Sequence, residues 1–111
     1  MAKFSADLNQ AFAALADATR RALLTQLASG PKSVSELAEP FELALPSLLK
    51  HLRVLEQSGL IRSEKVGRVR TCQLELQTLR QTEDWIRQHI SVWEQRLDRL
   101  ENHIESTKKK S

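Results

Sequence analysis

The chain has 111 residues, 41% of them hydrophobic and 28% charged, with a net charge of +3 and a pI near 9.4. This length allows one domain with one modest core. No apolar run approaches the ~18 to 20 residues of a membrane span, so no membrane partner is expected. The N-terminal sequence MAKFSADLNQ lacks the apolar core of a signal peptide. A single cysteine excludes an internal disulfide and suits a reducing cytoplasm, where we expect the protein to act.

Three helices are predicted in the first part of the chain. Apolar residues at helical spacing predict one helix over residues 7–15 and, after an aspartate that can cap it, a second over residues 18–28. Ser33 and Glu36 have the spacing of a capping box at the start of a third helix, although Ser35 could be the cap instead. The next proline limits that helix to about two turns.

A fourth helix and a hairpin follow. The helix is predicted from Leu45 or Pro46 to Gln57, because proline is favourable in a first turn and a glycine follows the last one. Strand-like runs over residues 60–66 and 69–76, joined by a Gly-Arg turn, predict an antiparallel hairpin. Three leucines of the helix share one face. The opposite face carries Pro46, Lys50, Arg53 and Gln57.

The last element is a long helix predicted over residues 79–106, which contain no glycine or proline. Its apolar residues are spaced 4, 3, 4, 3 and 4 apart, a heptad stripe typical of contacts between helices. We expect a second copy of the chain as the partner, because two-fold homodimers are the commonest oligomers. The alternative is packing against the chain's own first helix. The stripe consists of Ile86, Ile90, Trp93, Leu97, Leu100 and Ile104.

Positive charge is concentrated on the fourth helix and the hairpin. Residues 44–70 carry six Lys or Arg and two Glu, a balance of +4, whereas residues 77–106 carry four Arg and six acids, a balance of −2. Attraction to phosphates would explain this placement, and an ordinary solvated helix face is the alternative.

The order of helix, turn, basic helix and hairpin is that of a winged helix-turn-helix, whose second helix reads the DNA major groove. The predicted fold is mainly α (α+β), with about five helices and a two-stranded β-hairpin wing. Residues 1–106 are expected to form this single domain, with 79–106 as a terminal dimerisation helix and 107–111 as a disordered basic tail.

Residues 15–76 resemble the ArsR-type winged helix-turn-helix repressors, in the branch without metal-site cysteines. The matching segments are LADATRRALLTQL, SVSELAEPF, LPSLLKHLRVLEQSGLI and EKVGRVRTCQL, followed by the terminal WEQRLDRLENHIE. The resemblance implies a homodimeric repressor that binds a pseudo-palindromic operator in double-stranded DNA, with the first and last helices at the interface. It assigns no inducer.

The resemblance also implies which residues act. Two departures from the family stand in the fourth helix: Ala44 replaces a common hydroxyl cap, and Leu49 replaces a common small polar residue. Leu49 could touch a thymine methyl. In a rival interpretation, Leu49 and the uncapped helix dock on another protein. The expected DNA-binding residues are Pro46, Ser47, Leu49, Lys50, His51, Arg53, Lys65, Arg68 and Arg70. The expected dimer interface contains Leu8, Phe12, Ile86, Ile90, Trp93, Leu97 and Leu100.

No metal or cofactor is expected. The segment SVSELAEPF has none of the paired cysteines that metal-sensing relatives carry there. His89 and His103 are fourteen residues apart, so they could share an ion only across an antiparallel dimer contact, with Glu101 or Glu105 nearby.

No enzyme activity is expected either. The glycines are isolated and form no phosphate loop, and a Ser47–His51 pair has no third group to orient it. Cys72 is interpreted as a small apolar strand residue, because no second cysteine could resolve an oxidised form within the chain. A bridge between two chains is the alternative.

Overall fold

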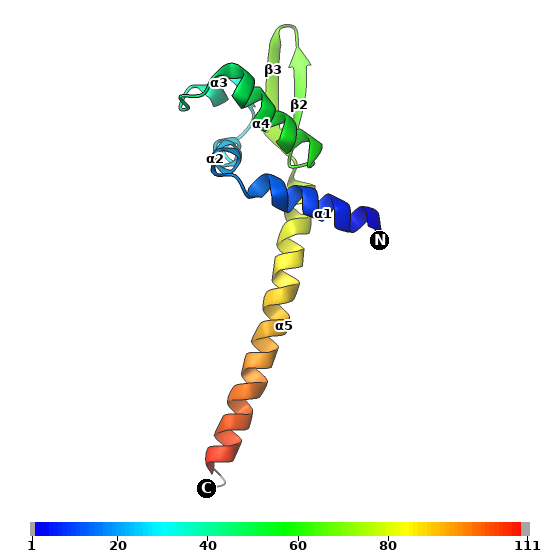
Figure 1. The fold of residues 1–111 in the computed structure, drawn as a ribbon, viewed down its shortest axis with the longest axis vertical. Helices are drawn as coiled ribbons and strands as arrows, with labels where there is room; N and C mark the ends of the chain where they lie inside the picture. The colour runs from blue at the N-terminus through cyan, green and yellow to red at the C-terminus, as the bar shows by residue number, and fades with distance from the viewer. Residues whose placement is uncertain (1, 110–111) are drawn as a thin grey trace.

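The computed structural model describes residues 2–109, with side chains from Leu8 to Thr107. Within that range the chain forms five helices and one three-stranded antiparallel sheet, which confirms the winged helix-turn-helix (Figure 1). The elements are α1 (Ala2–Leu15), α2 (Ala18–Leu27), β1 (Lys32–Ser33), α3 (Val34–Ala38), α4 (Leu45–Gln57), β2 (Ile61–Val66), β3 (Val69–Leu74) and α5 (Leu76–Lys109).

The core lies between the first four helices and the base of the hairpin. It is built largely from leucines, as expected for helices with one apolar stripe. From α5 only the half-buried Leu79 packs against it. The last helix is therefore attached to the domain near its start only. The buried apolar residues are Ala11, Ala14, Leu23, Leu24, Leu27, Leu37, Leu48, Leu52, Leu55, Leu60, Ile61 and Cys72.

Local signals set the helix ends close to where the sequence predicts them. The capping box is confirmed with Ser33 as the cap, because its hydroxyl accepts from the Glu36 N–H at 3.2 Å and the Glu36 carboxylate accepts from the Ser33 N–H at 3.1 Å. The alternative cap, Ser35, is wrong. At the end of α4, Gly59 has φ 77°, and the Leu60 N–H donates to the Leu55 carbonyl at 3.0 Å. This is a Schellman motif, in which glycine lets the chain turn left-handed.

The sheet has one more strand than the sequence predicts. The strand order is β1-β3-β2, and β1 pairs Lys32 with Cys72 and Ser33 with Thr71. Two residues give no period-2 pattern, so this strand exists only through its pairing with β3. The wing itself, β2 with β3, is confirmed, and Gly67 with φ 63° begins its two-residue turn. The second strand ends at Leu74, shorter than predicted.

The terminal helix is longer than predicted. It runs for 34 residues, about 51 Å at 1.5 Å per residue, and begins three residues before the predicted start. The predicted disorder of 107–111 is wrong for residues 107–109, which are helical, while residues 110 and 111 lie outside the described part. Likewise α1 begins at Ala2, before the predicted residue 7.

The molecule is elongated because α5 projects beyond the core (Figure 1). Its radius of gyration is 20.3 Å, whereas a compact chain of this length has about 13 Å. Its extents are 75 × 33 × 21 Å. Although α5 is long, neither it nor any other described helix combines its length with the apolar content that a membrane crossing requires.

Candidate nucleic-acid interface

The outer face of α4 is exposed, because the leucines on its other face are buried in the core. Pro46, Ser47, Lys50 and Arg53 are all exposed, as the helical period predicts. Leu49 lies at the edge of this face and is half-buried, with part of its side chain packed against the core. The structure therefore brings the predicted α4 residues together on one accessible strip.

The start of α4 has no side-chain cap, because Ala44 occupies the cap position. A cap side chain normally accepts from the second or third N–H of the helix. Here the second residue is Pro46, which has no N–H, and the N–H of Ser47 donates to the Ala44 carbonyl at 3.0 Å. The groups that a cap would satisfy are thus missing or already bonded. This explains how the fold tolerates the departure at Ala44.

A groove separates α4 from the wing. It encloses about 590 Å³ and has an apolar floor that includes Leu45 and Leu49. The wing side carries Lys65, Arg68 and Arg70, and the α3 side carries serine hydroxyls. An apolar floor between basic walls fits the edge of a nucleic acid, in which bases and phosphates lie side by side.

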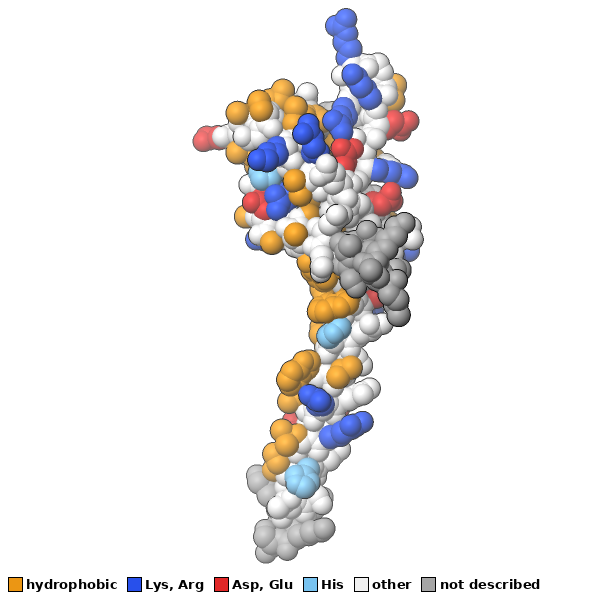
Figure 2. Space-filling model, turned by 45° about the vertical axis from the view of Figure 1, so that its right-hand side comes forward, with side chains coloured by type: hydrophobic (Ala, Val, Ile, Leu, Met, Phe, Trp, Pro, Cys, Tyr) orange, Lys and Arg blue, Asp and Glu red, His pale blue; other side chains and the backbone are white. Residues whose placement is uncertain are grey.

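Four of the bases around this groove are exposed and form no ion pair in the described part of the chain. They are Lys50 and Arg53 on α4 and Lys65 and Arg68 on the wing. Figure 2 shows Lys and Arg side chains gathered over the domain and hairpin, above the projecting helix. Unpaired bases on one side of a protein create the positive potential that attracts phosphate.

Two of the predicted DNA-binding side chains have partners within the molecule instead. His51 Nδ1 lies 3.4 Å from Arg20 Nη1 and 3.8 Å from an Asp17 carboxylate oxygen, at the start of α2. The Arg20 backbone N–H, with the charges of Arg20 and His51, holds the pKa of Asp17 below its usual value. Arg70 pairs with Glu56 at 2.6 Å. Neither orientation follows from helix or strand spacing, because both depend on tertiary neighbours.

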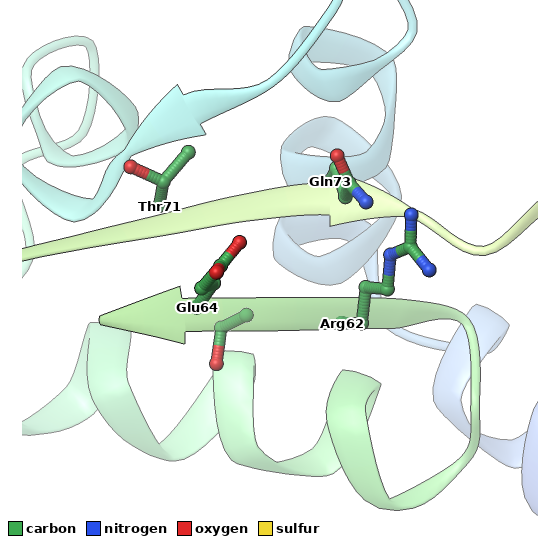
Figure 3. Close-up of a pocket in the computed structure, with 5 residues that line it drawn as sticks. Arg62, Glu64, Thr71 and Gln73 are labelled. Atoms are coloured by element: carbon green, nitrogen blue, oxygen red, sulfur yellow. The ribbon is translucent and has the colours of Figure 1, made fainter. Parts of the chain in front are cut away.

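The sixth base of this region, Arg62, lies in a separate polar hollow on the wing. The hollow holds about 410 Å³, and Figure 3 shows Arg62 and Glu64 of β2 near Gln73 and Thr71 of β3. With its side-chain amide oriented for bonding, the Gln73 oxygen accepts from Arg62. In the strand alternation Arg62 and Glu64 face opposite to Ser63. This hollow is therefore distinct from the groove beside α4.

The heptad stripe of α5 lies on the surface. Its six side chains are between 45% and 62% exposed, and hydrophobic side chains form a row along one side of the helix in Figure 2. Contact with α1 is confined to the start of α5, where the Phe12 and Trp85 rings lie 5.5 Å apart, edge to face. The alternative of packing along the chain's own first helix is therefore wrong for the stripe. Leu8 and Phe12 of α1 are half-buried beside this contact.

Comparisons with known proteins identify the family. Residues 15–64 match the model of a helix-turn-helix domain. The transcriptional repressor SdpR of Bacillus subtilis (strain 168) is 30% identical over 84 residues, covering 76% of this chain and 93% of that protein. A crystallised ArsR family transcriptional regulator is 51% identical with a TM-score of 0.77, covering 81% of this chain and 93% of that one. The chain belongs to the ArsR family of DNA-binding transcriptional regulators.

Two further relatives agree with this assignment. An ArsR-like regulator from Rhodococcus sp. RHA1 is 33% identical with a TM-score of 0.74, covering 86% of this chain and 91% of that one. The regulator Rv2034 of Mycobacterium tuberculosis is 40% identical over 67 residues, or 60% of this chain. The match spans 63% of Rv2034, less than two thirds of its length.

In this ArsR-family chain, residues 2–109 contain no group of three or more His, Cys, Asp or Glu that could hold a metal ion. His89 and His103 lie about 21 Å apart along α5, at 1.5 Å per residue. His89 stacks on Trp85 at 3.9 Å, and its Nδ1 donates to the Trp85 carbonyl at 2.8 Å. Cys72 is buried, and burial raises the pKa of its thiol. A protonated, buried thiol is a poor redox sensor.

Sequence analysis of the regulator missed two residues beside its surfaces. Trp85 is one residue before the stripe and links α5 to α1, and an aromatic next to a heptad core was the available signal. Glu56 pairs with a wing residue, and no sequence spacing indicates such a contact.

Proposed function

We propose that this chain is a homodimeric repressor whose two subunits each place α4 and the wing on one half of a pseudo-palindromic operator. Ser47 and Lys50 reach base edges or phosphates in the major groove, and Leu49 meets a thymine methyl. Arg53 contacts the backbone, and Arg68 extends from the wing tip to the minor groove or its flanking phosphates. The observation that carries the proposal is the set of exposed, unpaired bases around one groove beside α4.

The apolar stripe of α5 supports the homodimer. Monomeric soluble proteins rarely expose contiguous apolar patches of this kind, and such patches mark interaction sites. A helix that extends past its own core finds packing partners in a second copy, with Trp93 as the largest side chain of the contact. Leu8 and Phe12 of α1 lie at the end of α5 nearest the domain and extend the same interface.

Dimerisation is also what DNA binding requires. One α4 reads a few base pairs, whereas two copies held about 34 Å apart can enter successive major grooves on one face of the duplex. If Arg53, Lys65 and Arg68 of each subunit meet one phosphate, six contacts give a slope of log K against log salt of about −5. A measured slope of this size supports the electrostatic part of the proposal.

Selection from a library of random duplexes tests the proposal. The pure protein should recover a site with two half-sites related by two-fold symmetry, spaced by about one helical turn or a multiple of it. Recovery of a single asymmetric site would refute the dimeric arrangement. Failure to bind any duplex, even at low salt, would refute DNA binding and favour the rival protein-interaction module. A promoter that carries the recovered site should then be transcribed less in vitro when the protein is added.

A further inference from the structure

Three side chains join α4 to the wing. Glu56, in the last turn of α4, accepts from Arg70 Nη2 at 2.6 Å through one carboxylate oxygen and from the Ser63 hydroxyl through the other. Arg70 Nε also donates to the Ser63 oxygen at 3.0 Å. We call this group the Glu56 cluster. It closes a triangle of hydrogen bonds between one helix and both strands of the hairpin.

The Glu56 cluster sits where the hairpin leaves the domain. In the strand register Ser63 faces Cys72, and Arg70 faces Lys65, so Ser63 and Arg70 are diagonal neighbours on one face of the sheet. Cys72 on that face is part of the core, whereas residues 64–70 of the hairpin are all exposed. The cluster is thus the outermost side-chain contact between the wing and α4. It fixes the angle at which the wing tip stands beside the helix.

The cluster also sets Arg70 apart from the other bases. Of the six Lys and Arg in residues 44–70, Arg70 is the one that the described structure places in an ion pair. Its partner Glu56 has a side chain only 26% exposed, and charge-assisted, forked bonds of this kind are stronger than neutral ones. Moving Arg70 to a phosphate would leave the Glu56 carboxylate without its cation and close to a polyanion.

We propose that Glu56 and Arg70 are positioning residues that hold the wing against α4, and that Arg70 gives no phosphate contact, unlike Lys65 and Arg68. This inference rests on the proposed function, because its effect is read through DNA binding. It reassigns one wing arginine from contacting DNA to orienting the residues that do. The side chain must then supply a fork of N–H donors, and a positive charge alone does not suffice.

The test measures binding across a salt series, on the duplex that the wild type selects from a random library and on an unrelated duplex of equal length. Arg70→Ala should weaken binding to the selected duplex several-fold while the slope of log K against log salt stays at its wild-type value. The matched control, Arg68→Ala, should make that slope shallower by about 0.9, the value for one lost phosphate contact. A slope change of that size for Arg70→Ala would overturn the proposal.

Conservative variants distinguish the fork from the charge. Arg70→Lys should not restore affinity, because lysine cannot bond Glu56 and Ser63 together, whereas Arg68→Lys should retain most of the wild-type affinity. Full rescue by Arg70→Lys would overturn the proposal. Glu56→Gln should lower preference for the selected duplex over the unrelated one, and adding Arg70→Ala should bring little further loss. Additive losses would show that the two residues act separately.

These outcomes are separable from failure of the proposed function. A wild type that binds no duplex refutes DNA binding itself, whereas a wild type that binds with a normal salt slope but loses a phosphate contact in Arg70→Ala refutes only the positioning role. Thermal melting of each variant shows whether it is folded. Arg70 is 44% exposed, so its substitution leaves the leucine core in place.

Discussion

Trp93→Ala should separate the subunits without unfolding them. Trp93 is 62% exposed in the single chain, so with about 250 Å² for a tryptophan it offers about 150 Å² to a partner. Two symmetric copies offer about 300 Å², which corresponds to about 7.5 kcal/mol at 25 cal/mol per Å² if all of it is covered. Alanine retains part of this area and coverage at a helix contact is incomplete, so we expect about half, near ~4 kcal/mol. The dimer Kd should therefore rise on the order of 10³-fold.

Analytical ultracentrifugation over a concentration series measures that Kd for the wild type and the variant. Val92→Ala is a matched control, because Val92 is equally apolar and 56% exposed but lies about 120° around the helix from the middle of the stripe. The control should dimerise as the wild type does. Loss of the dimer should also abolish binding to the selected duplex in Trp93→Ala, although every DNA-facing residue remains. A wild type that is monomeric at micromolar concentration, or a variant with an unchanged dimer Kd, would refute the reasoning.

Three further predictions concern α4, its end and the buried cysteine. Lys50→Ala should weaken binding to the selected duplex by about 1–3 kcal/mol in gel-shift titrations at fixed salt, and an unchanged affinity with a native melting curve would remove Lys50 from the interface. Gly59→Ala should lower the free energy of unfolding in urea by about 1–2 kcal/mol, because Gly59 is left-handed and a Cβ there meets Thr78 Oγ1 at 3.1 Å. Gly67→Ala, with positive φ but open space, should cost less, and an equal loss would exclude the Thr78 contact as a cause. Since burial raises the pKa of Cys72, its thiol should react slowly with disulfide reagents at pH 7 and rapidly in urea, and prompt native labelling would contradict its burial.

The elements themselves could be predicted because their signals are local. Helical spacing of leucines, the Ser33 capping box and the glycines after α4 and within the hairpin act within a few residues of themselves, so the sequence places α2, α3, α4 and the wing nearly where the structure has them. The exposed strip of α4 follows in the same way, since burying one side of a helix exposes the other. The predicted DNA contacts on that strip remain predictions that the selection experiment tests.

The tertiary structure decided what depends on distant partners. Strand β1 is two residues long and exists through its pairing with β3. His51 and Arg70 share the basic region with Lys50 and Arg68, but Asp17 and Glu56 draw them inward, and those acids are 34 and 14 residues away along the chain. The exposure of the α5 stripe also required the fold, because a heptad pattern does not state which surface covers it. A sequence period records which side chains share a face, whereas the neighbour that the face meets is set by how the whole chain packs.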